Sequence, residues 1–391
     1  MTPPTPPLKL ALVSRRYPPL IGGAERVLAY LAEALAREGA DVSVLTSAVG
    51  EAAGLPTREA LDYSKSRGGG RLTIHRLETS PLRFFGTWLY MRNLRRWLAA
   101  NPVDLAYVSM LKHDAYVAVG AGRERGFPVV LRPEGAGDTG DVAWQARGNF
   151  GARIARRTRD ADAFVAISKA VHDELAGAGY DAAKIHDLPN GVPIPARPWQ
   201  RRKGWQEAPH AMFVGRLAPE KGLTTLVRAW PAVRSSFPNA RLTLVGEGPE
   251  RPALERAARD LGLPAGAVSL PGATDDVEAA LRAADLFVLP STEEGMSIAL
   301  LEAMAIGVPV VATAIPGNRR LIADFKHGRL APARDVDALA RTIVEQWTTF
   351  DRAFHMSRAA RGRVEQQFSI RAVARGHLQL FQELIARERS G

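Results

Sequence analysis

The sequence predicts an α/β protein with two doubly wound parallel sheets, and three observations lead to this fold class. Short apolar runs alternate along the chain with segments whose apolar residues recur at helical spacing. This alternation is interrupted at residues 193–209, which are rich in proline and charge and indicate an interdomain linker, and then begins again. The chain has 391 residues, which is enough for two domains of ordinary size. Strands that alternate with helices form parallel sheets covered by helices.

The first half begins with an apolar run that predicts a buried strand at residues 8–14. Leu28, Leu31 and Leu35 follow at helical spacing, and Gly39 is suited to end this helix. A later helix is predicted to begin at Lys169. The remaining strand segments of this half are expected at 41–47, 105–110, 128–134, 161–168 and 184–191.

The second half repeats this architecture without repeating the sequence. Its strands are predicted at 211–215, 241–246, 268–272, 286–291 and 308–313. Its helices are predicted at 223–235, around 253–261, around Glu302 and, as long helical patterns, from Val336 to Ala386. Asp275 and Asp276 look like a metal-binding pair, but an N-cap role for the helix that begins at Val277 fits them better.

The composition excludes several classes of protein. Because cysteine is absent, disulfides, thiol catalysis and cysteine–zinc sites are ruled out. The first 16 residues lack the apolar run of a signal peptide, and no uncharged run reaches the ~20 residues of a membrane-spanning helix. We therefore expect a soluble, cytoplasmic protein. Its formal net charge of +11 indicates polyanionic partners such as nucleic acid, an anionic membrane or phosphorylated substrates.

A basic stretch at residues 63–103 carries part of this excess. It contains a single acid, Glu78, and its basic residues are Lys65, Arg67, Arg71, Arg76, Arg83, Arg92, Arg95 and Arg96. On a helix, the last three of these arginines fall within one quadrant, with Phe85 and Leu89 beside them. Arginines next to aromatic side chains suit an anionic membrane surface. The alternative is a core-packed helix with a solvated basic edge.

Two loops that follow predicted strands carry residues suited to phosphate, and in open α/β sheets ligands bind at this edge. Arg216 and Lys221 follow the strand at 211–215, and their spacing lets both cations converge on one anion. Gly22 and Gly23 follow the first strand and open a helix, so backbone N–H groups there can approach an anion or a sugar.

The segment 291–305 is the most informative part of the sequence. Glu294 lies in the loop after the strand at 286–291, and Glu302 lies eight residues later inside a helix. Eight residues of helix span about 12 Å, so the two carboxylates can hold two parts of one elongated ligand. Between them, the helix is opened by N–H groups that can receive phosphate, those of Gly295, Met296, Ser297 and Ile298.

These residues together carry a resemblance to a known family. The chain resembles the retaining glycosyltransferase-4 family, whose members have the two-domain GT-B fold. The resemblance covers nearly the whole length, and the Glu294-x7-Glu302 spacing is its most specific motif. The other matching segments are 17–46, 166–171, 188–193, 214–222, 244–250 and 270–313.

The resemblance implies transfer of a sugar from a nucleotide diphosphate sugar to an acceptor hydroxyl, in polysaccharide, lipopolysaccharide or glycolipid biosynthesis. UDP, GDP and ADP remain open as the donor nucleotide, and neither a metal nor a further cofactor is expected. Residues 1–195 would form the acceptor-binding domain, with a final helix at 369–391 that crosses back to it. Residues 196–368 would form the donor-binding domain.

The resemblance also implies roles for single residues. Arg216 and Lys221 would hold the donor diphosphate together with the amides of 295–298. Glu302 would bind the ribose, Glu294 would contact the transferred sugar, and the base would lie near Leu270–Gly272. The glycines that would face the donor phosphate and the acceptor are Gly22 and Gly23.

One departure from the family pattern concerns the acceptor side. Many relatives carry a histidine after the strand that corresponds to 128–134, where this chain reads Arg132-Pro133-Glu134-Gly135. Glu134 is our candidate for this position, because a carboxylate can orient an acceptor hydroxyl or support positive charge. Other acceptor-side candidates are Asp138 and Asp141 nearby, and His113.

The sequence weighs against three other classes. An NAD-dependent oxidoreductase would need G-x-G-x-x-G after the first strand, where residues 14–23 read SRRYPPLIGG. A nucleic-acid binder would show zinc spacing or a basic tail, and neither is present. A non-catalytic module would not need the charged residues that this chain retains, which are Arg216, Lys221, Glu294 and Glu302. A small soluble acceptor remains the alternative to a lipid-linked acceptor, and the basic stretch favours an enzyme peripheral to the inner face of a membrane.

Overall fold

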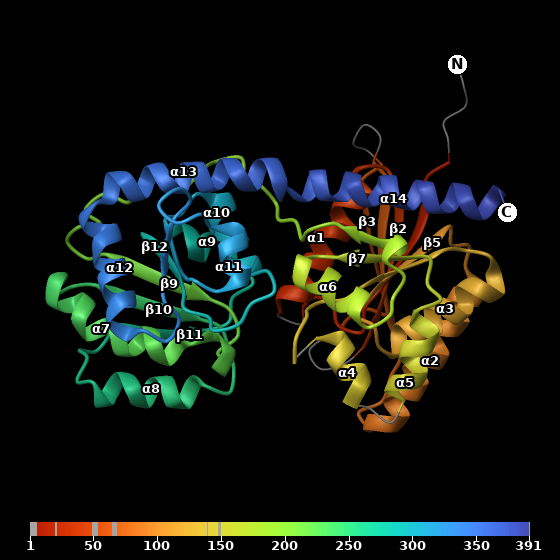
Figure 1. Cartoon of the computed structure of the whole chain (residues 1–391), viewed down its shortest axis with the longest axis horizontal. Coiled ribbons are helices and arrows are strands. Elements are labelled where there is room, and N and C mark those ends of the chain that lie inside the picture. The colour runs from red at the N-terminus through yellow and green to blue at the C-terminus, as the bar shows by residue number, and fades with distance from the viewer. Residues whose placement is uncertain are drawn as a thin grey trace, which may run out of the picture. The chain divides into compact units, whose positions relative to one another are not determined.

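The computed structural model describes residues 6–19, 22–48, 54–64, 69–138, 140–147 and 150–390, and the chain divides into two compact units (Figure 1). Unit 1 comprises Met1–Gly191 and Ile370–Gly391, and unit 2 comprises Val192–Ser369. The sequence-based boundaries were residues 195 and 368. Each unit contains a sheet whose strands alternate with helices, which confirms the predicted fold class.

Within the described residues, unit 1 contains an eight-stranded sheet in the order β3-β4-β2-β1-β5-β6-β7-β8. The strands are β1 Lys9–Val13, β2 Asp41–Ser47, β3 Arg58–Asp62, β4 Arg71–Leu77, β5 Leu105–Ser109, β6 Val129–Arg132, β7 Ala163–Ala166 and β8 Ile185–Asp187. The helices are α1 Gly23–Arg37, α2 Arg83–Ala100, α3 His113–Arg125, α4 Asp141–Arg147, α5 Gly151–Thr158, α6 Lys169–Gly177, the short 3-10 helix η2 Ala182–Lys184, and α14 Ile370–Ser390.

The edge strand β3 and its neighbour β4 have no counterpart in the sequence prediction. All five residues of β3 are exposed, and it pairs with β4 in antiparallel orientation, so it carries no apolar signal. In β4, buried and polar residues are mixed, and Arg76 is itself buried. The other strand pairs of unit 1 are parallel, so its sheet is parallel with one antiparallel edge strand.

Unit 2 contains, in the part of the chain that is described, a six-stranded parallel sheet in the order β11-β10-β9-β12-β13-β14. The strands are β9 His210–Val214, β10 Arg241–Val245, β11 Val268–Gly272, β12 Leu286–Leu289, β13 Val310–Thr313 and β14 Arg329–Ala331. The helices are η3 Pro219–Lys221, α7 Leu223–Ser236, α8 Arg251–Asp260, α9 Val277–Arg282, α10 Ile298–Ile306, α11 Pro316–Leu321, α12 Val336–Thr348 and α13 Phe350–Gln367. Helices α7 and α8 cover one face, and α9 and α10 cover the other (Figure 1).

Two short elements of unit 2, α11 and β14, were also absent from the sequence prediction, because each is too short to show a periodic pattern. The predicted N-cap at Asp276 is confirmed, since its carboxylate accepts a hydrogen bond from the N–H of Ala279 at 2.8 Å. The long helical pattern at the end of the chain consists of the three separate helices α12, α13 and α14.

The segment 193–209 contains no helix or strand, as expected of a linker, but it is packed against unit 2. Trp199 and Trp205 are both 4% exposed and lie against the ring of Phe350 in α13. The indole N–H of Trp199 donates to the carbonyl of Ala284 at 2.9 Å. The segment follows the boundary between the two units, and two large aromatic side chains pack it onto unit 2.

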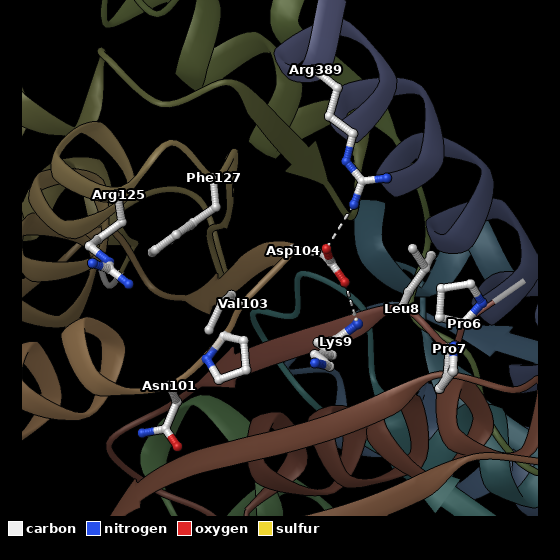
Figure 2. Close-up of a pocket in the computed structure, with 11 residues that line it drawn as sticks. Pro6, Pro7, Leu8, Lys9, Asn101, Val103, Asp104, Arg125, Phe127 and Arg389 are labelled. Carbon is white, nitrogen blue, oxygen red and sulfur yellow. Dashed lines mark hydrogen bonds and ion pairs between the residues drawn. The ribbon is translucent and has the colours of Figure 1, made fainter.

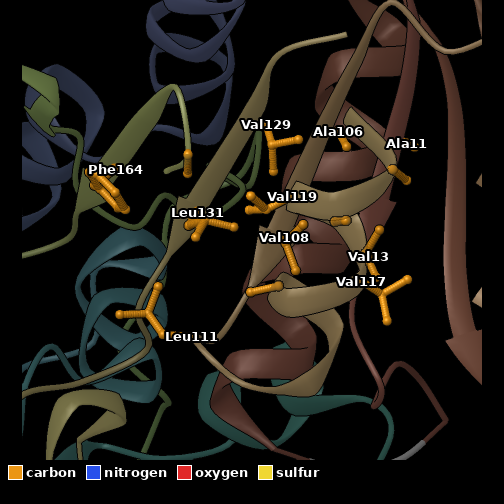
Figure 3. Packing of buried hydrophobic residues seen from close by; sticks show 14 of the residues in the cluster. Ala11, Val13, Ala106, Val108, Leu111, Val117, Val119, Val129, Leu131 and Phe164 are labelled. Atoms are coloured by element: carbon orange, nitrogen blue, oxygen red, sulfur yellow. The ribbon is translucent and has the colours of Figure 1, made fainter. Parts of the chain in front are cut away.

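The core of unit 1 has two layers, one on each face of its sheet. Ala11 and Val13 belong to the layer beneath α2 and α3, part of which is drawn in Figure 3. Their neighbours in β1, Leu10 and Leu12, belong to the layer beneath α1 and α14. Successive side chains of a strand point to opposite faces, so a strand buried on both faces is apolar at every position. This is why the interior strands were readable as continuous apolar runs.

Helix α14 completes the second of these layers and carries a buried polar contact. The phenol of Tyr107 lies 3.2 Å from Nε2 of His377, and Nδ1 of His377 lies 2.8 Å from the carbonyl of Val373. A carbonyl only accepts, so Nδ1 carries the hydrogen and Nε2 accepts from the phenol. Complete burial lowers the pKa of His377 from 6.5 to about 4.

We predict that His377 makes the stability of the protein fall at mildly acidic pH. In the unfolded chain a histidine binds a proton below about pH 6.5, whereas in the native state His377 binds one only below about 4. Between these values the unfolded state binds more protons. Lowering the pH through this range therefore decreases the free energy of unfolding by up to roughly 3 kcal/mol. Thermal unfolding across this pH range should show a weaker pH dependence in His377→Gln than in the parent.

The matched control is His355→Gln, which removes an exposed histidine of α13. This variant should keep the pH dependence of the parent protein. An unchanged slope in His377→Gln would contradict the assignment of the titration to His377.

Candidate active site

The site candidates lie where the strand order of each sheet reverses. In unit 2, the chain runs from β9 outward to β10 and β11, and then returns to place β12 on the other side of β9. In unit 1, β1 has the same position between β2 and β5. At such a switch point the loops that leave two adjacent strands diverge, and the carboxyl edge between them is open to a ligand.

In unit 2, the loops after β9 and β12 bring Lys221 and Glu294 into direct contact. The Lys221 ammonium lies 2.7 Å from Glu294 Oε1, and the hydroxyl of Ser291 donates to the same oxygen at 2.8 Å. Both side chains are largely covered, with 21% of Lys221 and 9% of Glu294 exposed. The two residues are 73 positions apart in the sequence. Sequence analysis identifies each of them as a candidate but does not predict their contact.

Gly222 allows these two loops to approach closely. The N–H of Thr292 donates to the carbonyl of Glu220 at 2.8 Å, which ties the loops together. Gly222 has a φ of +62°, and a Cβ added to it would lie 2.3 Å from the carbonyl oxygen of Pro290. No side chain fits there, so glycine at this position sets where Lys221 lies relative to the loop after β12.

Arg216 is placed differently from Lys221. Its side chain is 66% exposed, and its guanidinium lies 2.5 Å from Glu220 Oε1. Partial burial alone would raise the pKa of Glu220, but hydrogen bonds from its own backbone and from Arg216 hold that pKa below its ordinary value. Each of the two cations named from the sequence therefore has a carboxylate partner, and Lys221 is the more enclosed of the two.

The amino end of α10 follows Glu294 in the chain, with Ser297 three residues after it. Ser297 is the N-cap residue, and its hydroxyl accepts from the N–H of Leu300. Met296, Ser297 and Ile298 are buried, whereas Gly295 is exposed. Further along α10, Glu302 is 7% exposed, which places a carboxylate inside a helix that is otherwise apolar.

Two glycines shape the surroundings of this region. Gly317 of α11 lies against the loop after β12, and a Cβ added to it would be 2.2 Å from the carbonyl oxygen of Glu294. Gly272 ends β11 with a φ of +99°, and a Cβ added to it would be 3.1 Å from Oε1 of Glu247. Gly317 was not named from the sequence, because a single glycine in a short helix gives no signal of a close backbone contact.

In unit 1, the amino end of α1 already holds a carboxylate of its own. Glu25 is 7% exposed, and its Oε1 lies 2.9 Å from Nε of Arg16. A Cβ added to Gly22 would lie 2.0 Å from Oε2 of Glu25, so this carboxylate occupies the space above the glycine. Gly23 is the first residue of the helix and is exposed. The function of the glycine pair as a ligand loop stays a prediction.

Glu134 lies in a polar network after β6. Its Oε1 accepts from the hydroxyl of Ser109 at 2.7 Å, and its N–H donates to Oδ2 of Asp141 at 2.9 Å. Burial raises the pKa of Glu134, although the Arg132 guanidinium and the Ser109 hydroxyl act in the opposite direction. Asp141 is itself 3% exposed, and burial raises its pKa as well. Glu134 and Asp141 are thus brought together as the sequence suggested.

The other two acceptor-side candidates have different partners from this pair of carboxylates. The carboxylate of Asp138 is 97% exposed and forms an ion pair with Arg147 at 3.5 Å. His113 begins α3, and its ring packs edge-on against Trp144. Burial lowers the pKa of His113, and the nearby cations Arg15 and Lys112 lower it further.

Family models match both halves of the chain. Residues 21–194 match the model described as Glycosyltransferase Family 4, and residues 208–348 match the model described as Glycosyl transferases group 1. Each half of the chain thus carries a glycosyltransferase domain, and the chain is a glycosyltransferase. This confirms the resemblance inferred from the sequence, and with it the enzyme class, glycosyl transfer from a nucleotide sugar.

Individual relatives agree with this assignment. The chain is 29% identical over 379 residues to the GDP-mannose-dependent alpha-(1-6)-phosphatidylinositol monomannoside mannosyltransferase of Mycobacterium tuberculosis, covering 92% of this chain and 94% of that protein. Its fold matches that of the sucrose-phosphate synthase of Thermosynechococcus elongatus, with a TM-score of 0.77, 22% identity, and coverage of 97% and 100%. It also matches Anabaena HepE, solved with UDP and glucose, with a TM-score of 0.76, 20% identity, and coverage of 96% and 100%.

The glycosyltransferase contains a cavity of about 330 Å³ away from these residues, at the amino ends of β1, β5 and β6 (Figure 2). Its one acid, Asp104, accepts from the backbone N–H of Lys9 at 2.8 Å and from Arg389 at 2.9 Å. Helices α2, α3 and α14 end here, and their C-terminal carbonyls account for the nearby arginines. A five-residue strand separates this edge from the carboxyl edge by roughly 15 Å.

Helix α2 of the glycosyltransferase presents an apolar surface that we call the α2 patch, formed by Leu82, Phe84, Phe85 and Trp88. These side chains are 67%, 85%, 51% and 52% exposed, respectively. The rings of Phe85 and Trp88 stack at 5.6 Å, and the Arg92 guanidinium lies 4.9 Å from the Trp88 ring. Exposed aromatic side chains gathered in this way mark an interaction surface more often than an ordinary solvated helix.

The structure corrects parts of the sequence-based description of residues 63–103. Leu89 is 8% exposed and belongs to the interior, so it adds no exposed apolar surface beside the arginines. Arg76 is buried and paired with Glu59, and Arg95 is paired with Glu124. Arg71, Arg92 and Arg96 are exposed. Lys65, Arg67 and the side chain of Arg83 lie outside the residues that the structure describes.

The sequence did not name Ser109, Arg132 or Asn190 as part of the site. Arg132 was quoted only as a neighbour of Glu134, and Asn190 only as part of a family motif. The sequence does hold one sign of this cluster, since the apolar run 128–132 ends on Arg132. An arginine at the end of a buried strand needs polar partners nearby, because a buried guanidinium must be hydrogen-bonded.

We predict that Gly222→Ala destabilises the enzyme more than Gly262→Ala does. Both glycines have nearly the same φ, +62° and +63°, so each alanine meets about 1 kcal/mol of left-handed strain. Only Gly222 also has a backbone oxygen at 2.3 Å from the added Cβ, whereas nothing lies within 4 Å at Gly262. The extra overlap should cost about 1 kcal/mol or more, measured by urea unfolding. Equal losses in the two variants would show that the two loops tolerate separation.

Proposed function

We propose that this enzyme is a retaining hexosyltransferase in which Lys221, Arg216 and the amino end of α10 bind the donor diphosphate. The observation that carries this assignment is the Lys221–Glu294 pair at the strand-order reversal of unit 2, beside the N-cap of α10. A diphosphate at this edge would meet a lysine ammonium and helix N–H groups. It would share the ammonium with Glu294.

The leaving group explains why cations are needed here. When the bond between the anomeric carbon and the phosphate breaks, negative charge develops on the diphosphate and positive charge on the sugar. Lys221 and Arg216, together with the helix end, stabilise the first of these charges. Glu294, which is anchored by Ser291, lies where a carboxylate can contact the transferred sugar. In this proposal Glu302 binds the ribose, and the base lies near Gly272.

Unit 1 supplies the acceptor side of the proposal. Glu134 orients the acceptor hydroxyl or supports the positive charge of the sugar, and Asp141 holds the backbone of Glu134 in place. Gly22 and Gly23 contact the donor phosphate or the acceptor. For retention, we propose attack on the face from which the diphosphate leaves, with the leaving phosphate accepting the proton of the acceptor hydroxyl. No covalent protein nucleophile is required.

The donor nucleotide can be identified by a direct binding screen. The mycobacterial relative is named for GDP-mannose, and HepE was solved with UDP, so the screen compares UDP-, GDP- and ADP-sugars. A ligand at 100 times its Kd stabilises the folded enzyme by about 2.7 kcal/mol, which a thermal shift detects readily. A protein that none of these donors stabilises would contradict the proposed donor site.

We predict that Lys221→Ala lowers kcat by about a hundredfold or more, because one preorganised donor to the leaving diphosphate is lost. Arg216→Ala should act in the same direction, and both variants should remain folded. Turnover is measured with the donor found in the screen. The matched control is Lys326→Ala, which removes an exposed lysine of unit 2 outside the site. Near-normal turnover of Lys221→Ala would remove Lys221 from the mechanism.

We further propose that the enzyme acts on a lipid-linked acceptor and docks to an anionic membrane through the α2 patch. Among the residues that the structure describes, no helix is long and apolar enough to cross a bilayer. Aromatic side chains beside exposed arginines suit the boundary between anionic headgroups and acyl chains. Arg92 and Arg96 supply the charge complementary to the lipid.

We predict that Phe84→Ser combined with Trp88→Ser weakens binding to vesicles of phosphatidylcholine and phosphatidylglycerol. The two changes remove apolar area that the bilayer would bury, and cosedimentation measures the loss. Arg92→Glu with Arg96→Glu should also weaken binding, and only for vesicles that contain the anionic lipid. Phe325→Ser, at an exposed phenylalanine of unit 2, serves as the control. Undiminished binding of both double variants would refute docking through α2.

A further inference from the structure

A buried arginine lies directly behind Glu134. Arg132 ends β6 and is 3% exposed, and it lies at the same carboxyl edge of the sheet as Ser109, the last residue of β5. Strands β5 and β6 pair so that Ser109 is opposite Arg132. Nη1 of Arg132 lies 3.4 Å from the hydroxyl oxygen of Ser109, which in turn lies 2.7 Å from Oε1 of Glu134.

The direction of these hydrogen bonds follows from the chemistry of the groups. A guanidinium only donates, so the Ser109 oxygen accepts from Arg132. Its own hydrogen is then free to point to Glu134, which accepts it. The contact at 3.4 Å is long for a hydrogen bond. The positive charge of Arg132 therefore acts on Glu134 mainly through space, while Ser109 fixes the direction of the carboxylate.

The other side of Arg132 is bound to the end of unit 1. Its Nη2 donates to Oδ1 of Asn190 at 2.6 Å, and Asn190 is 5% exposed. This residue lies in the segment that follows β8, next to Gly191, at which the first part of unit 1 ends. A cavity of about 10 Å³ lies alongside, lined in part by Arg132, Asn190, Tyr107 and His377. Nη1 and Nη2 of Arg132 are both engaged, and the residue is 3% exposed. Arg132 is therefore not placed to contact a substrate directly.

Glu134 is surrounded by charges of both signs. Arg132 is the positive neighbour that lowers its pKa, whereas Asp141 and Glu25 raise it. Burial raises the pKa of the Tyr107 phenol well above its ordinary value. The charge of Arg132 lowers this pKa and the charge of Glu134 raises it. Lys112 lies 3.8 Å from Asp141 and so offsets part of that negative charge. The positive charge of Arg132 thus opposes the effect of two carboxylates on Glu134.

We propose that Arg132 is a positioning residue, which through Ser109 orients the Glu134 carboxylate and keeps it ionised for the reaction. The inference rests on the proposed role of Glu134 at the acceptor side. Its function would then be indirect: Asn190 anchors the guanidinium, the guanidinium stabilises the carboxylate, and the carboxylate meets the acceptor. Neither Arg132 nor Ser109 contacts the sugar.

The test is the pH dependence of kcat in variants of Arg132. If Glu134 acts as a carboxylate, kcat falls at low pH as it takes up a proton. Arg132→Gln keeps a hydrogen-bonding side chain but removes the charge, so this acid limb should move to higher pH by about one unit or more. Arg132→Lys keeps the charge and should restore most of the limb to its original position. The apparent KM for the donor should change little, because Arg132 does not touch it.

Two further variants guard against a simple loss of folding. Ser109→Ala is a small change that removes one hydrogen bond to Glu134, and its acid limb should also move upward. Arg76→Gln is the matched control, because Arg76 is another buried arginine of the same sheet, paired with Glu59 and distant from Glu134 in strand order. It should lower the unfolding temperature without moving the acid limb.

Glu134→Gln separates the failure of this inference from the failure of the proposed function. If the acid limb persists unchanged in Glu134→Gln, then Glu134 does not titrate in the reaction, and both the acceptor-side role and the role of Arg132 fall. If the limb disappears in Glu134→Gln but does not move in Arg132→Gln and Ser109→Ala, then Glu134 acts without them and only the positioning role is overturned. A limb that moves equally in Arg132→Lys and Arg132→Gln would likewise overturn the part played by charge.

Discussion

The pairing of β9 with both β10 and β12 is the constraint on which the proposed donor site of this glycosyltransferase depends. Strand order in this sheet runs outward from β9 to β11 and then reverses to β12. The connections that follow the adjacent strands β9 and β12 therefore lead to helices on opposite faces of the sheet. The loops themselves stay close together at the carboxyl edge, where Lys221 contacts Glu294. Gly222 makes this meeting possible, since a side chain there would overlap the carbonyl of Pro290. The charged pair is therefore a consequence of strand order and of one missing Cβ.

The two units handle charge in different ways. In unit 2, the two named cations are each balanced by a nearby carboxylate, at the edge where a diphosphate would bring further negative charge. In unit 1, the acids Glu25, Glu134 and Asp141 are wholly or partly buried, and arginine side chains lie close to two of them. A carboxylate that leaves water needs such a partner to stay ionised. The buried Arg132 is thus tied to the state of Glu134.

The net charge of +11 acquires a more specific meaning from the structure. Several basic residues of the stretch 63–103 do not contribute to a surface field, because Arg76 is buried and Arg95 is paired. What distinguishes helix α2 is apolar exposure, with Phe84 85% accessible and Trp88 stacked between Phe85 and Arg92. Charge alone would fit many polyanions, and the exposed aromatic rings beside exposed arginines are the basis of the proposed docking to a lipid surface.

The sequence by itself determined the interior strands, the helix that starts after Asp276 and the loops that carry Arg216, Lys221 and Glu294. These features depend on local free energies: an apolar run is buried whatever its neighbours, and a cap binds its own helix. The tertiary structure decided the rest. The exposed strand β3, the burial of Trp199 and Leu89, and the contacts of Lys221 with Glu294 and of Arg132 with Asn190 depend on which strands and loops become neighbours. That choice is made by packing and strand order across the whole sheet, and no local pattern records it.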